Sequence, residues 1–157
     1  MCCFLLPTTL QHYDVDEIKI FTFGGAKSHD ICGGILETDA ADYEAKKRKL
    51  DEWGISYRIN HVNWWEQEMP SEEEMKEGLN NLALNGNQVD FIVSHCCASS
   101  TGEALKQGDY VEDPLAVYFE EIRKNVKYKK WFFGHYHGNK NVTADEILLY
   151  EQIIRIN

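Results

Sequence analysis

Three histidines lie just beyond two apolar runs of this 157-residue chain, and these side chains are the ones best suited to chemistry. His95 follows the run Val89–Val93, and His135 and His137 follow the run Trp131–Phe133. Imidazole binds zinc, iron, manganese and nickel, and histidines at strand ends can hold such an ion against a substrate. The pattern therefore predicts a metal site formed by His95, His135 and His137.

The spacing of His135 and His137 predicts how their side chains lie. If the segment is extended, both imidazoles point to the same side, and their Cα atoms are about 6.5–7 Å apart from a rise of about 3.3 Å per residue. They can then bind one ion together, or each can bind one of two ions about 3.5–4 Å apart, as in two-metal hydrolases. Tyr136 is expected to point the opposite way, into packing. The remaining histidines, His12, His29 and His61, lack this context and are interpreted as ordinary polar residues.

Apolar runs predict the strands that position these histidines. Strands are expected at Ile18–Phe23, Val89–Val93 and Lys130–Phe133, with two shorter candidates at Glu146–Tyr150 and Gln152–Ile156. The first ends at Gly24-Gly25, where a tight turn is expected. The continuous run Val89–Val93 is typical of a strand that is covered on both faces.

Two helices are indicated by capping residues. Ser71 and Glu74 form the pattern of a capping box. Asp113 can cap a second helix that has Pro114 in its first turn. The residues expected to face inward are Met75, Leu79, Leu82 and Ala83 in the first helix, and Leu115, Phe119, Ile122 and Val126 in the second.

Helices that alternate with buried strands predict an α/β layered fold in a single domain, residues 1–157, with a mixed sheet flanked by helices. The charged stretch Ala40–Trp53 is interpreted either as a surface helix that ends at Gly54 or as an exposed insertion. In open α/β sheets, ligands bind at the carboxyl ends of the strands. His95 and His135 both lie just past such ends.

Composition limits the partners and the compartment. A formal charge of −10 argues against binding to a nucleic-acid backbone, which needs a basic surface. No run approaches the roughly 18 apolar residues of a membrane span, so no membrane partner is expected. The five cysteines include two adjacent pairs and no C-x-x-C motif, which predicts a reducing, cytoplasmic location.

Beyond the histidines, the sequence resembles the calcineurin-like metallophosphoesterases. Ser94-His95 and Gly134-His135-Tyr136-His137 are similar to the last two metal-binding motifs of that family. Supporting matches are Phe23-Gly24-Gly25-Ala26, Ser28, Asp30, Arg58, Trp64-Trp65 and Glu68. The resemblance extends from Ile18 to the C-terminus.

The resemblance implies a calcineurin-like layered sandwich with a site for two divalent metal ions, which can be Mn, Fe, Zn or Ni. Such ions bridge a phosphate ester and activate a water molecule. At the level of single residues, the resemblance implies that His95 and His135 ligate one metal and that His137 ligates the other. Asp30 and Arg58 either form an ion pair that supports this site or are independent surface charges.

The family's Asp-x-His, Gly-Asp-x-x-Asp and Gly-Asn-His motifs have no counterpart in this sequence. The chain therefore resembles the C-terminal half of the family fold, and we expect partial metal occupancy and little phosphatase activity from it alone. The implied substrates are phosphomonoesters or phosphodiesters, including protein phosphoserine or phosphothreonine.

Three origins account for such a sequence. It is a gene fragment or a mis-called start, a split enzyme completed by an N-terminal polypeptide or by a second copy, or a repurposed binding module. The alternative class of function is a non-catalytic binding or structural module whose histidines are vestigial or hold a single ion.

Two further groups of residues contain side chains or turns that resemble chemical sites. Gly24-Gly25-Ala26 lacks the Lys-Ser/Thr ending of a P-loop, which favours a simple strand-end turn. Cys96 and Cys97 beside His95 suggest a catalytic dyad, but no orienting third group can be identified. Buried small side chains are therefore the favoured interpretation of the two cysteines.

Overall fold

The computed structural model describes residues 12–15, 18–27, 31–106 and 111–156. They fall into two compact units. The first unit comprises residues 1–26 and 70–157, and the second comprises residues 27–69. The predicted metal-binding histidines all belong to the first unit.

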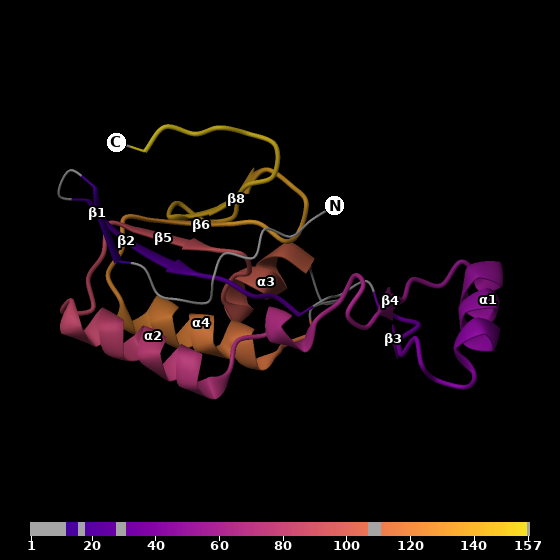
Figure 1. Ribbon diagram of the computed structural model, residues 1–157. Helices are drawn as coiled ribbons and strands as arrows, with labels where there is room; N and C mark the ends of the chain where they lie inside the picture. The colour runs from indigo at the N-terminus through magenta and orange to yellow at the C-terminus, as the bar shows by residue number, and fades with distance from the viewer. Residues whose placement is uncertain (1–11, 16–17, 28–30, 107–110, 157) are drawn as a thin grey trace. The chain divides into compact units, whose positions relative to one another are not determined.

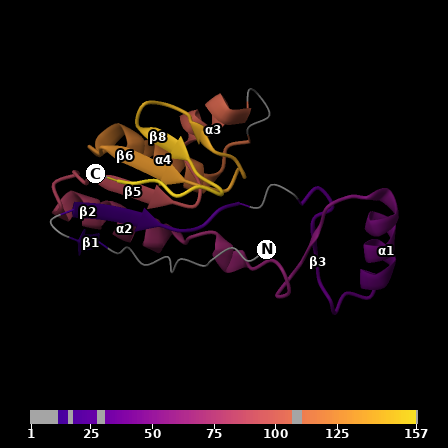
Figure 2. The same cartoon turned by 90° about the horizontal axis from the view of Figure 1, so that it is seen from above.

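The first unit contains a six-stranded mixed sheet (Figure 1). Its strands are, in spatial order, β1 (His12–Val15), β2 (Ile18–Phe23), β5 (Phe91–Ser94), β6 (Lys130–Phe133), β8 (Glu146–Leu148) and β7 (Lys140–Asn141). The four central strands are parallel, and β1 and β7 pair antiparallel at the two edges. Figure 2 shows β2, β5 and β6 side by side in this order. The predicted α/β class with a mixed sheet is therefore confirmed, and the sheet is mostly parallel.

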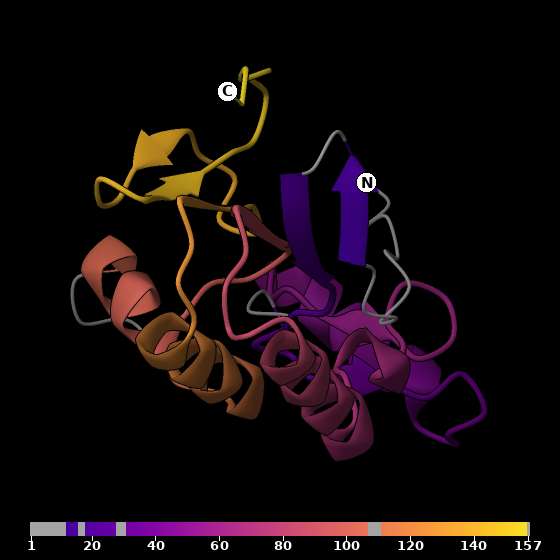
Figure 3. The ribbon, with the colours of Figure 1, turned by 90° about the vertical axis from the view of Figure 1, so that its left-hand side faces the viewer.

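Three helices, α2 (Glu72–Leu84), α3 (Ser99–Lys106) and α4 (Pro114–Asn125), lie on one face of the sheet (Figures 1 and 3). Aromatic rings fill the space between the two layers. The Phe23 ring on β2 contacts those of Tyr118 and Phe119 on α4, at centroid distances of 4.8 and 5.8 Å. The Trp131 ring on β6 meets Phe119 edge-on at 5.5 Å. These buried rings form the centre of the core.

Both predicted helix caps are confirmed. The Ser71 backbone N–H donates to Glu74 Oε2 at 2.8 Å, and the Glu74 N–H donates to Ser71 Oγ at 3.2 Å. Asp113 Oδ1 accepts hydrogen bonds from the backbone N–H groups of Leu115 and Ala116 at 2.9 and 3.0 Å. The inward face of α4 is also as predicted, because all four of its named residues are buried.

The predicted inward stripe of α2 is only partly right. Leu82 is buried, but Ala83 is exposed, and the other buried position is Gly78. Tyr118 lies against Gly78, where a glycine allows the phenol to approach the helix backbone. The buried face of α2 is therefore centred on a glycine and differs from the predicted face. The spacing of apolar side chains cannot reveal this, because glycine has no side chain.

Replacing Gly78 with alanine is expected to lower the free energy of unfolding by about 1–3 kcal/mol, although alanine is the better helix former. A Cβ atom at this position would overlap the Tyr118 hydroxyl and lie 3.2 Å from a Phe23 ring carbon. Urea denaturation followed by circular dichroism measures the change.

The matched control is Gly78→Ala combined with Tyr118→Phe. The Tyr118 hydroxyl is buried and has no hydrogen-bond partner among the described residues, so its removal opens space at little cost. The double variant should regain most of the lost stability. A single variant as stable as the wild type would contradict the steric argument.

Several strand predictions require correction. β5 begins at Phe91 rather than Val89, although burial of the neighbouring residues Phe91 and Ile92 confirms cover on both faces. The candidate at Glu146–Tyr150 is shortened to β8, which ends at Leu148. The predicted strand Gln152–Ile156 is wrong, because that segment pairs with no strand and the Ile153 side chain is fully exposed.

The second unit is small and largely exposed. It contains β3 (Ile35–Leu36) paired parallel to β4 (Arg58–Ile59), α1 (Tyr43–Trp53) and a 3-10 turn at Glu66–Glu68. The surface-helix interpretation is confirmed, because α1 has no buried residue and ends at Gly54 in the left-handed conformation. Across the described residues of both units, no helix combines the length and the apolar character needed to cross a membrane.

Candidate metal centre

The carboxyl ends of β5 and β6 bring His95 and His135 together. These strands are parallel neighbours, with Ser94 paired to Phe133, so both chains leave the sheet at the same edge. His95 comes immediately after β5, and Gly134 separates β6 from His135. A backbone hydrogen bond from Gly134 N–H to the His95 carbonyl, 3.1 Å long, joins the two segments beyond the strands.

The two imidazoles are in direct contact. His135 Nδ1 lies 3.3 Å from His95 Nε2, and the ring centroids are 5.2 Å apart. An N–H of one neutral ring can hydrogen-bond to the bare nitrogen of the other at this distance. The distance also suits metal binding, because two nitrogens bound tetrahedrally to one zinc ion at about 2.0–2.1 Å lie about 3.3–3.4 Å apart.

His137 does not join this pair. Its ring packs on the Tyr150 ring with a centroid distance of 5.1 Å, and the side chain is exposed. Within the described parts of the chain, no three side chains of His, Cys, Asp or Glu converge to hold a metal ion. The structure therefore brings together two of the three predicted ligands and leaves His137 beside them.

The extended geometry predicted for this segment is wrong. His135 and His137 have positive φ angles of 66° and 48°, in the left-handed region. The Tyr136 N–H donates to the Gly134 carbonyl at 2.8 Å, which closes a three-residue turn centred on His135. Left-handed conformations are uncommon for residues other than glycine and are often found at functional sites.

Burial favours the neutral form of the His95 ring. Burial lowers the pKa of His95 below its ordinary value, and the nearby His137 ring lowers it further. Only a neutral imidazole has a lone pair available for a metal ion. His95 is therefore able to act as a ligand at a lower pH than an exposed histidine.

The Tyr136 ring meets the His135 ring edge-on at a centroid distance of 5.0 Å, so the prediction that it points away from His135 is wrong, whereas the predicted packing is confirmed. Its hydroxyl lies 3.7 Å from Cys96 Sγ and 3.6 Å from Cys97 Sγ, and both cysteines are buried. The hydrogen bond with Cys96 and burial raise the pKa of Cys97 far above its ordinary value. A thiol that resists ionisation is a poor nucleophile, which argues against a catalytic role for Cys97. The hydrogen bond with Cys97 instead lowers the pKa of Cys96, so for Cys96 the packing interpretation rests on its burial.

The two proposed support residues cannot be assigned to the site. Asp30 lies outside the described residues, so its ion pair with Arg58 stays a prediction. Arg58 belongs to β4 of the second unit, where its N–H donates to the Gly34 carbonyl at 3.1 Å. Of the other histidines, His12 is in β1, His61 is exposed in the second unit, and His29 is not described.

Sequence reasoning missed a buried hydrogen-bond chain beside the histidine pair. The Trp131 indole N–H donates to Ser94 Oγ at 2.7 Å, and the Ser94 hydroxyl donates to the Cys96 carbonyl at 2.5 Å. The sequence feature that indicates this chain of bonds is Ser94, a serine at the end of an otherwise apolar strand. A hydroxyl buried there needs hydrogen-bond partners.

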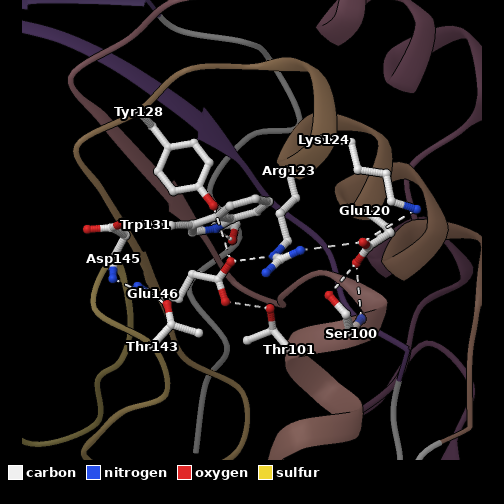
Figure 4. A network of polar contacts seen from close by, with 11 residues as sticks. Ser100, Thr101, Glu120, Arg123, Lys124, Tyr128, Trp131, Thr143, Asp145 and Glu146 are labelled. Carbon is white, nitrogen blue, oxygen red and sulfur yellow. Dashed lines mark hydrogen bonds and ion pairs between the residues drawn. The ribbon is translucent and has the colours of Figure 1, made fainter.

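A second polar cluster surrounds Glu146 on β8, and the sequence did not indicate it (Figure 4). The buried Glu146 carboxylate accepts hydrogen bonds from Thr101 Oγ1, Arg123 Nε and the Tyr128 hydroxyl at 2.7, 2.7 and 3.1 Å. Arg123 also approaches Glu120. The cluster ties α3 and α4 to β8, which makes it structural.

Comparison with known proteins gives no relative of this chain. It matches no protein-family model, no curated protein and no solved structure. Inference about its function therefore rests on its own residues and their geometry.

Proposed function

We propose that this chain carries the histidine half of a calcineurin-like metallophosphoesterase site, which hydrolyses phosphomonoesters or phosphodiesters, protein phosphoserine and phosphothreonine included. One observation carries the proposal. His95 Nε2 and His135 Nδ1 lie 3.3 Å apart at the carboxyl ends of two adjacent parallel strands. This is the spacing of two ligands on one ion, at the edge where α/β sheets bind ligands.

Each histidine has a distinct role in the proposed site. His95 and His135 hold the first metal, for which their nitrogens are already spaced. His137 holds the second, and its exposed ring must leave Tyr150 to do so. When bound, the two ions would bridge the phosphate and lower the pKa of the attacking water.

The remaining ligands are proposed to come from sequence outside this chain, such as a complementary polypeptide, because a second copy of the chain would lack the same motifs. Two-metal phosphoesterases need carboxylates that bridge the ions and an acid that protonates the leaving group. No such motif accompanies the histidines in this sequence. Mixing the chain with a polypeptide that carries Asp-x-His and Gly-Asn-His motifs tests whether a site can be completed.

The chain alone is expected to hydrolyse p-nitrophenyl phosphate no faster than buffer with Mn²⁺, Zn²⁺ or Ni²⁺ present, because it lacks the bridging carboxylate. Release of p-nitrophenol at 405 nm over several hours gives the rate. The matched controls are His135→Ala and His61→Ala, the latter an exposed histidine of the second unit. Metal-dependent turnover that disappears in His135→Ala but persists in His61→Ala would contradict this expectation.

A second candidate function is a binding or structural module that holds a single ion. The observation that favours it is the position of His137, which stacks on Tyr150 rather than beside the other two rings. Metal content after equilibration with excess zinc and desalting separates the candidates. Two equivalents favour the two-metal site, one equivalent favours the single-ion module, and none favours a vestigial site.

A further inference from the structure

The buried hydrogen-bond chain of Trp131, Ser94 and Cys96 has a defined direction. An indole N–H can only donate, so Ser94 Oγ accepts from Trp131 Nε1 at 2.7 Å. The single proton of the Ser94 hydroxyl is then directed to the Cys96 carbonyl, 2.5 Å away. Ser94 and Trp131 are 5% and 1% exposed, so water cannot replace either bond without local opening.

This chain of bonds encloses the backbone of His95. Ser94 and Cys96 are its two neighbours in sequence, so the bond between them closes a turn with His95 in the middle. Trp131 lies on β6, and its indole fixes the Ser94 hydroxyl to the strand that leads into His135. On the far side of the turn, Gly134 N–H holds the His95 carbonyl at 3.1 Å.

We propose that Ser94 is a positioning residue that sets the separation of the two imidazole nitrogens, and with it the affinity and coordination geometry of the bound metal. This inference rests on the proposed metallophosphoesterase site. Without the hydroxyl, the Trp131 N–H and the Cys96 carbonyl are both left without this partner in a buried setting. The turn around His95 relaxes to satisfy them, and the 3.3 Å nitrogen spacing is lost.

The experiment is a Co²⁺ titration of the full chain, followed by the visible ligand-field spectrum. Ser94→Ala is expected to bind Co²⁺ about 10–100-fold more weakly than the wild type, with shifted bands, which is the effect of losing an outer-shell partner. Ser94→Thr keeps the hydroxyl and should restore both affinity and spectrum. A role confined to stability would lower the unfolding midpoint and leave the spectrum of the folded protein unchanged.

Two further variants make the test independent of folding losses. Trp131→Phe removes the donor to Ser94 and leaves a smaller ring against Phe119 and Tyr128, so its unfolding midpoint is measured alongside. The folded variant should bind Co²⁺ several-fold more weakly than the wild type. Tyr128→Phe is the matched control, because it deletes a hydrogen bond to Glu146 away from the histidine turn. It is expected to reduce stability with no change in the Co²⁺ spectrum.

The possible failures are distinguishable. If the wild type binds no Co²⁺, or if His135→Ala binds it equally well, the proposed metal site is wrong and the role of Ser94 is rejected with it. If binding depends on His135 but neither Ser94→Ala nor Trp131→Phe changes affinity or spectrum, only the positioning role is overturned.

Discussion

Replacing either His95 or His135 with alanine is expected to weaken zinc binding by about 100-fold or more. Loss of an outer-shell partner already costs about 10–100-fold, and each of these residues is a proposed direct ligand. Their nitrogens lie 3.3 Å apart, and no third His, Cys, Asp or Glu among the described residues joins them, so no neighbouring ligand can substitute for a lost histidine. Competition with a chromophoric chelator at fixed pH measures the dissociation constant.

The other histidines provide graded controls for this experiment. His137→Ala is expected to have a smaller effect on the first ion, because the His137 ring packs on Tyr150 and not on the pair. His61→Ala should have no effect, because His61 is exposed in the second unit. Wild-type zinc affinity in both His95→Ala and His135→Ala would refute the proposed centre.

The double variant His95→Ala/His135→Ala adds a test of cooperation. Two ligands of one ion act as a unit, so removing the second should cost little once the first is gone. Two independent weak sites would instead show losses in free energy that add. Additive losses would therefore assign the histidines to separate ions and contradict the pairing.

The parts of the fold that were predictable are those fixed by local sequence. Ile18–Phe23 and Lys130–Phe133 form strands with the predicted limits, because each is a short, mainly apolar or β-branched run next to turn residues. Ser71 and Asp113 mark helix starts because a side-chain acceptor satisfies free N–H groups of the first turn.

The elements that were missed depend on contacts distant in sequence. α3 lacks a clear apolar repeat, and its first turn is held by α4, where Glu120 Oε2 accepts from the Ser100 N–H and hydroxyl at 3.0 and 2.7 Å. The wrong strand at Gln152–Ile156 shows the opposite error. Its isoleucines favour a strand, but β-propensity forms none without a neighbouring strand to pair with.

The candidate site was predictable in its residues but not in its shape. The positions of His95 and His135 after parallel strands correctly predicted that the two would meet. The left-handed angles at His135 and His137 were not predictable, since most residues avoid that region and nothing in the local sequence required it. Those angles separate His137 from the pair.

Replacing Arg123 with methionine is expected to cost about 3 kcal/mol of unfolding free energy, toward the lower end of the range for breaking a buried ion pair. Arg123 Nε lies 2.7 Å from Glu146 Oε1, and the Glu146 side chain is only 4% exposed. Methionine keeps the apolar stem but leaves a buried carboxylate without its cation. Arg123 is itself partly exposed, so entering water offsets some of the cost. Urea denaturation followed by circular dichroism measures the loss.

Lys124→Met is the matched control, because it removes the same charge from the adjacent position of α4. Lys124 Nζ is 3.5 Å from Glu120 Oε1 and 66% exposed, so the loss should stay below about 0.5 kcal/mol. Combining Arg123→Met with Glu146→Gln should recover much of the stability, because glutamine is uncharged and still hydrogen-bonds beside Thr101 and Tyr128. If the double variant is no more stable than Arg123→Met, the cost comes from the other lost contacts of the guanidinium, such as that with Glu120, rather than from the stranded charge.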